Sequence, residues 1–417
     1  GLGSAVSVVL DTSDVRALLG ARVNGSGAIE QGTSLTHVHV GDSVGFANVT
    51  VSADATRTLR LATGAGGVGL TGAGLGIAVT VGQITGAVDA MIGDYATVGT
   101  AAHKVGNVTV EAGGEAHVKP YVDGDPMGIA LSGGLFAGSA GITDVRIGGD
   151  GTSGQAALLT VKASLGQGAA IDATGDVAIT ATSTYEALVS ADGGAIGAVA
   201  VGAMVARGDI VSTTEAKAKS YSKVNARSLK IASDNTSDTK VSTVSAAGGI
   251  GAGAGTKSET HVTPKVYASI DAHATVTTTG DKNTGAVEVT ATSVRAKGSA
   301  TGRGYTIGGG SVGVMLSEGY VTPTAHASIG DDAIVTAGGD VTVQADILAK
   351  TTGLQLDDYF QPATDLSTSN DTIHFDAHGL SDGSVVTYDP NGNTAITTDD
   401  QSSTHPALET GREYKVL

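Results

Sequence analysis

The chain has 417 residues, of which 63 are glycine and 3% are aromatic, and it contains neither cysteine nor tryptophan. This composition leaves few large side chains for a thick globular core and excludes disulfides and thiol chemistry. A net charge of −17 opposes binding to nucleic acids or to anionic membranes. Hydrophobic residues still make up 41% of the chain, and β-branched residues recur in alternation, which favours folded strands over disorder.

The N-terminal sequence GLGSAVSVVLDTSD has no basic start and reads like the middle of a repeat, so we expect no signal peptide there. The C-terminal sequence GREYKVL ends within a predicted strand. Both ends are therefore expected to be cuts through a longer polypeptide.

A short alternating strand that ends near an alanine recurs along the chain, and such alternation is typical of strands with one buried face. Its copies occupy residues 48–54, 107–112, 176–183, 228–233, 286–293 and 340–346. Glycine-rich apolar runs follow, about 55 to 65 residues apart, from Gly66, Gly128, Gly193, Gly248 and Gly308. An alanine-rich strand with a turn completes a unit of about 60 residues, as at 88–98, 266–276 and 325–335.

The segments between these strands carry Gly-Asp, Gly-Gly, Asp-Asn and Asn-Gly pairs, which favour turns. The Asp-Asn pair, at residues 234–235, thus predicts a turn. The unit length varies, which argues against a closed propeller and for an open stack. The predicted fold class is all-β, a parallel β-helix or β-solenoid over residues 1–350. The pattern breaks from about Leu354, and residues 351–417 are predicted to form a small β module.

Residues 329–345 read IGDDAIVTAGGDVTVQA, and residues 270–291 follow the same pattern more loosely. With the Gly/Ala/Val run that follows it, this pattern resembles the repeat regions of giant bacterial filamentous adhesins, the haemagglutinin-like and leukotoxin-like surface proteins. The resemblance covers about residues 1–350 and implies extracellular structural or adhesive work, with no catalytic residue carried over. The tail, with HGLSDGSVVTYD at 378–389, resembles a small β repeat of similarly giant secreted proteins.

Acidic turns are the candidate metal sites, because carboxylate oxygens suit calcium. The candidate ligands are Asp94, Asp150, Asp331, Asp332 and Asp389. Neither tandem nonapeptide calcium repeats nor an EF-hand loop occurs, so solvated carboxylates are the simpler interpretation and no cofactor is required. His37 and His39 would face one side of a strand, but the spacing supplies no third ligand.

Two further patterns have a structural and a functional interpretation. Residues 61–88 are uncharged over a length that would span a membrane, but the glycines make the run weakly apolar, so a buried β layer is predicted. Thr-x-Thr pairs such as Thr180 and Thr182 or Thr290 and Thr292 would suit the hydroxyl ladder of an ice-binding solenoid. Strand propensity with a solvated face is the simpler interpretation.

We expect a structural segment of a large secreted bacterial surface protein, a rigid stalk or adhesive filament without enzymatic activity. Its partners would be copies of itself or another cell surface, with no nucleic acid and no stable membrane span. One alternative is a fibre or sheath subunit that self-assembles through exposed strand edges. A second is a β-helix enzyme acting on polysaccharides, for which acidic pairs such as Asp123 and Asp125 carry little weight in so acidic a chain.

Overall fold

The computed structural model describes residues 1–24, 28–30, 39–40, 47–149 and 159–356, together with four short strands within 366–415. The chain divides into two compact units, Gly1–Asp357 and Asp358–Leu417. All regular secondary structure in these residues is β, which confirms the predicted all-β class.

The strands of the first unit are β1 (Leu2–Asp11), β2 (Val15–Leu19), β3 (Arg22–Val23), β4 (Ile29–Glu30), β5 (His39–Val40), β6 (Val49–Leu61), β7 (Thr63–Ile84), β8 (Gly86–Ile92), β9 (Thr97–Val98), β10 (Val108–Pro120), β11 (Gly128–Ile147), β12 (Leu159–Leu165), β13 (Ala170–Asp172), β14 (Val177–Ile196), β15 (Val199–Ala218), β16 (Lys223–Ala226), β17 (Leu229–Ile270), β18 (Thr275–Thr278), β19 (Val287–Val321), β20 (Thr324–Ile329), β21 (Ile334–Thr336), β22 (Val341–Ile347) and β23 (Lys350–Leu356). The second unit contains two antiparallel pairs, β24 (Leu366–Ser367) with β25 (Thr372–Ile373) and β26 (Val385–Thr387) with β27 (Glu413–Lys415).

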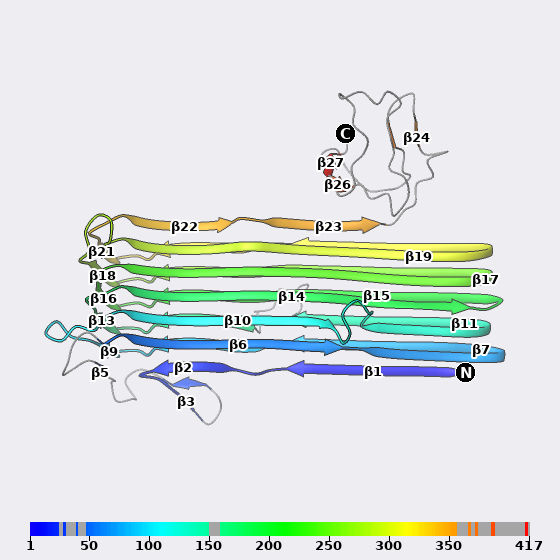
Figure 1. The fold of residues 1–417 in the computed structure, drawn as a ribbon, viewed down its shortest axis with the longest axis horizontal. Coiled ribbons are helices and arrows are strands. Elements are labelled where there is room, and N and C mark those ends of the chain that lie inside the picture. The colour runs from blue at the N-terminus through cyan, green and yellow to red at the C-terminus, as the bar shows by residue number, and fades with distance from the viewer. Residues whose placement is uncertain are drawn as a thin grey trace. The chain divides into compact units, whose positions relative to one another are not determined.

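The first unit is a stack of flat layers, seen edge-on in Figure 1. In each layer the chain runs out along one arm, turns back at the end that we call the tip, and returns along a second arm. A short third strand closes the opposite end, which we call the corner end. The complete layers, numbered 1 to 5, span residues 49–98, 108–172, 177–226, 229–278 and 287–336. Partial layers flank them, one containing β1, β2 and β5 and the other β22 and β23.

Every strand pairing between layers is parallel, and the register is kept from one layer to the next. Val49 pairs with Val108, and equivalent positions recur after 59, 69, 52, 58 and 54 residues. Layer 2 is long because residues 121–127 stand where layer 1 has only Ala62, and residues 148–158 stand where it has only Thr85; the pairing resumes after each. Extra length thus lies mainly in connections; the exceptions are register shifts inside strands, at Gly134/Phe136 in β11 and at Asn235/Thr236 in β17.

The interior becomes thinner from the corner end to the tip. At the corner end, buried Val, Ile and Leu side chains such as Ile92, Ile171 and Ile231 pack between the two arms and the short third strands. Near the tip the buried cluster contains only alanines: Ala137, Ala195, Ala200, Ala247, Ala252 and Ala254. Each Val, Leu or Ile that is buried contributes about 1.5–3 kcal/mol, so the corner end holds most of the hydrophobic stabilisation.

Glycine allows the two arms to approach each other at the tip in the first layers. A Cβ on Gly67 would lie 1.9 Å from the carbonyl oxygen of Leu75, and one on Gly76 would lie 2.1 Å from that of Leu131. No side chain fits at these inward positions, which gives the glycine-rich runs their physical reason.

A polar cluster crosses the interior between the apolar regions. The Asn235 amide donates to the Ser183 hydroxyl (2.7 Å) and its carbonyl accepts from Ser237 (2.9 Å), while Ser183 also bonds Thr214 (2.6 Å). These residues are buried. The turn predicted at residues 234–235 is therefore wrong: both residues lie inside β17, because the buried amide finds its partners within the stack.

Two sequence predictions can be compared directly with the strands. The boundary predicted after residue 350 falls at the start of β23, which pairs with β19 of layer 5. The uncharged run at 61–88 is confirmed as strand, but it is not wholly buried, since Leu75 and Ile77 point outward and are about half exposed. Among the described residues no helix is long and apolar enough to cross a membrane.

Candidate interaction surface

The outer side of the return arms is apolar over its tip half. We call this surface the apolar face. It contains no charged residue in the segments 2–10, 73–81, 136–143, 199–206 and 310–317, and one, Lys257, in the matching segment 251–258 of layer 4. Its large exposed side chains include Leu75, Ile77, Phe136, Ile142, Val199, Val201, Val205, Val312, Val314 and Leu316. This arrangement reverses the usual one, because small residues face inward and large apolar residues face solvent.

Parallel register arranges these side chains in columns that run across the layers. One column contains Leu75, Gly138, Val201, Gly253 and Val312 in layers 1 to 5. The next contains Ile77, Ala140, Ala203, Gly255 and Val314. Large and small residues thus alternate along the first column, so the surface is ridged.

Layer 4 forms a trough in the apolar face. A Cβ on Gly251 would meet nothing within 4 Å, and one on Gly253 would meet only atoms at 3.9 Å, one of them Cγ2 of Val201. The walls are the valines of layers 3 and 5, with Val201 54% and Val312 67% exposed. At Gly138 in layer 2 the equivalent space is partly filled, because Cδ2 of Leu75 lies 2.8 Å from the ideal Cβ position.

A band of charged residues borders the apolar face on its corner side. Arg146 pairs with Asp144 (2.6 Å) and Arg207 with Asp209 (2.6 Å). In the cross-layer register Asp144 lies beside Arg207, and Arg146 lies beside Asp209. Opposite charges therefore alternate in both directions, which stabilises adjacent parallel strands.

The band continues into layers 4 and 5. Lys257 reaches Glu259 (3.0 Å) and Glu318 (3.5 Å), and the hydrogen bond that its ammonium donates to Glu259 raises the pKa of Lys257. The buried His261 contacts Asp209 through Nδ1 (3.0 Å) and stacks on Tyr320 with ring centroids 4.9 Å apart. These ion pairs are satisfied within the chain and border the apolar face, which Lys257 enters at the column of Val205.

The corner turns repeat one strained backbone conformation in every complete layer. Tyr95, Gly168, Tyr221, His273 and Asp332 occupy the same register position, with φ between 55° and 65°. Only glycine adopts this region without cost. Cross-layer hydrogen bonds hold the row, as from the Tyr221 N–H to the Ala272 carbonyl (3.3 Å), and the rings of Tyr221 and His273 stack at 4.8 Å.

The predicted calcium ligands that the structure describes are not gathered at one site. Asp94 lies in the corner turn of layer 1, where Oδ1 accepts the Gln167 N–H (2.8 Å), whereas Asp331 and Asp332 lie in layer 5. Asp150 and Asp389 lie outside the described residues. Among those described, no group of three or more His, Cys, Asp or Glu side chains could hold a metal ion. Calcium binding stays a prediction.

The other candidate residues have separate surroundings. His37 is not among the described residues, and His39 belongs to β5. Asp123 pairs with Arg60 (3.3 Å) at a solvent-exposed site. The column that contains Thr180 and Thr290 has Ala232 between them, so a threonine ladder is interrupted there.

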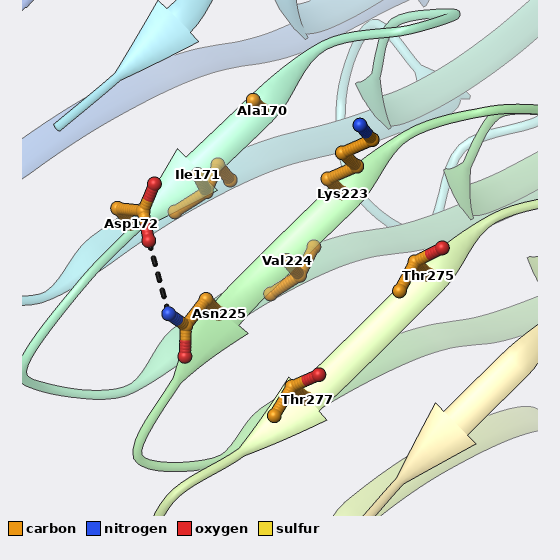
Figure 2. A pocket seen from close by; sticks show the side chains of 8 residues that line it. All are labelled: Ala170, Ile171, Asp172, Lys223, Val224, Asn225, Thr275 and Thr277. Atoms are coloured by element: carbon orange, nitrogen blue, oxygen red, sulfur yellow. Dashed lines mark hydrogen bonds between the residues drawn. The ribbon is translucent and has the colours of Figure 1, made fainter. Parts of the chain in front are cut away.

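A shallow hollow of about 270 Å³ lies on the sheet of short third strands, over β13, β16 and β18 (Figure 2). Ile171 and Val224 form part of its lining, and Asp172 accepts a hydrogen bond from the Asn225 amide (3.0 Å). Lys223 is the cation of this lining. The one carboxylate of the lining, that of Asp172, already accepts the hydrogen bond from Asn225. The lining has the polarity for a small polar molecule but contains no paired carboxylates for acid–base chemistry.

Sequence reasoning missed the apolar face, although its signal is present. Residues 74–81 read GLGIAVTV, with small residues at even positions and large ones at odd positions. The alternation predicts a strand but not which side faces inward, and the buried β layer predicted for residues 61–88 places the large residues inside. Comparison of the chain with protein-family models, with curated proteins and with solved structures gives no match.

Proposed function

We propose that this chain is a structural, non-enzymatic segment of a large secreted bacterial surface protein, a β-solenoid that serves as a rigid stalk or adhesive filament. The single observation that carries the proposal is the parallel pairing of equivalent strands through five complete layers. Each layer buries its side chains on the next, so stability accumulates by nearest-neighbour stacking and the stack can be extended without a new core.

The ion pairs and ring stacks support the same role. Arg146 with Asp144 and His261 with Tyr320 are contacts within or between adjacent layers, as are the corner hydrogen bonds. Contacts of this kind resist bending and sliding of one layer over another. The bacterial surface location rests on the resemblance of residues 329–345 to filamentous adhesins.

Single-molecule stretching of the whole chain between its two ends tests this function. A stalk of stacked layers should yield a series of force peaks, each releasing one layer of 52 to 69 residues. At about 3.5 Å per extended residue, each step adds about 180–240 Å of contour length. Featureless extension at low force would contradict a mechanical role.

A further inference from the structure

We propose that the apolar face is the contact surface for a second copy of this chain, whose layers run in the opposite direction. The proposal names the partner of the structural role proposed above and rests on that role. It concerns the flat outer side of the return arms, not the strand edges at the ends of the stack.

The observation that favours a second copy as the partner is a match of shape. The outward side chains of layer 3, which we call the ridge, are complementary to the trough of layer 4. In layer 3 the outward side chains are Val199, Val201 and Ala203, and in layer 4 the same three columns contain Gly251, Gly253 and Gly255. A twofold axis parallel to the strands, between layers 3 and 4, places the ridge of each copy over the trough of the other. The contact of layer 3 with layer 4 therefore forms twice, as in any isologous pair.

The same axis brings layer 5 opposite layer 2, and the sizes match there in the two columns nearest the tip. In the corner-side column Leu316 lies opposite Ile142, and in layers 3 and 4 Val205 lies opposite Lys257. Gly310 of layer 5 occupies the column of Phe136, and Val312 the column of Gly138. The match at Gly138 is looser, since Leu75 leans over this position. The valines of layer 3 against the glycines of layer 4 are therefore the closest contact.

The size of the surface sets the expected strength. Four layers at about 4.8 Å and about eight residues at 3.3 Å give about 500 Å² of flat sheet on each copy. Two copies bury about 1,000 Å², the lower limit for a specific interface. We therefore expect reversible pairing in the micromolar range.

A lipid surface is the other occupant of an apolar face, and two observations disfavour it. A fluid bilayer gains nothing from a ridge beside a trough, whereas a solid partner fills the trough. The net charge of −17 also repels anionic membranes.

Sedimentation equilibrium of the whole chain, up to about 100 µM, tests the pairing. Gly253→Val fills the trough and should weaken pairing about tenfold or more. Val201→Gly should weaken it by removing the ridge. The double variant Val201→Gly/Gly253→Val exchanges ridge and trough, so it should pair within about threefold of the original chain. Gly64→Val, on the other outer side and with nothing within 4 Å of its Cβ, is the matched control and should have no effect.

Far-UV circular dichroism and melting of each variant establish that it folds. A chain that stays monomeric throughout the concentration range overturns the proposal, as does a double variant no better than the single ones. Flotation with neutral phosphatidylcholine vesicles completes the test. A monomeric chain that floats with the vesicles, and loses this on Val201→Asp, would identify lipid as the occupant. A monomer that still unfolds layer by layer under force would leave the mechanical function standing.

Discussion

The close approach of the two arms at the tip makes a specific prediction about Gly76. In Gly76→Ala the new Cβ would lie 2.1 Å from the carbonyl oxygen of Leu131, so the arms must separate by about 1.3 Å to reach an ordinary contact of 3.4 Å. Overpacking usually costs about 1–3 kcal/mol, and backbone cannot turn aside as a side chain can. We therefore expect the free energy of unfolding to fall by about 3 kcal/mol.

The matched control is the same substitution on the same strand, β7. Gly64 has nothing within 4 Å of its ideal Cβ, so Gly64→Ala should stabilise the fold by about 0.4–1 kcal/mol through the unfolded chain. Urea unfolding followed by circular dichroism measures both, and hydrogen exchange of residues 128–143 locates the loosening. Effects of the same sign, or a Gly76→Ala variant as stable as the original, would refute the reasoning.

Three further predictions concern the interior. Asn235→Ala removes two buried hydrogen bonds and should cost about 1–3 kcal/mol in urea unfolding; an unchanged midpoint would show that the polar cluster contributes nothing. Burial raises the pKa of Asp192 in the folded chain, so the protonated side chain favours the folded state. This contribution is complete below pH 3.8, the ordinary pKa of aspartate, and is lost as the pH rises through the folded-state pKa. Asp192→Asn should therefore raise the melting temperature at pH 7 but not at pH 3; equal shifts would contradict this. Val287 is 0% exposed and its register partner Val341 is 50% exposed, so Val287→Asp should cost several times more in unfolding free energy than Val341→Asp, and equal losses would refute the burial argument.

The strands of the first unit could be predicted where apolar residues alternate with polar ones. Residues 176–183 show this, since Val177, Ile179 and Ala181 face inward in β14. The turn predicted at residues 234–235 failed because Asp-Asn favours turns when its side chains meet solvent or its own backbone. Here Asn235 bonds Ser183, which is 52 residues earlier, and no local pattern contains that partner.

The apolar face could not be predicted from the residues alone. The thickness of the interior decides which side of a small/large alternation faces inward. That thickness depends on glycines of different layers, such as Gly74 and Gly133, that come together only in the stack: a Cβ on Gly74 would lie 2.2 Å from the Gly133 carbonyl oxygen. The candidate metal ligands among the described residues, Asp94, Asp331 and Asp332, stay apart for a related reason, because equivalent turns of the repeat align along the stack axis instead of meeting at one point.

The connection at residues 121–127 shows that the fold accommodates additional residues between its strands. Seven residues stand where layer 1 has one, yet Thr63 pairs with Gly128 as directly as Leu61 does with Pro120. Insertions and deletions in such connections should therefore leave the pairing of the flanking strands unchanged. The same property suits the chain to display: an epitope or enzyme loop grafted between Pro120 and Gly128 would be presented at a fixed place on a regular lattice of strands.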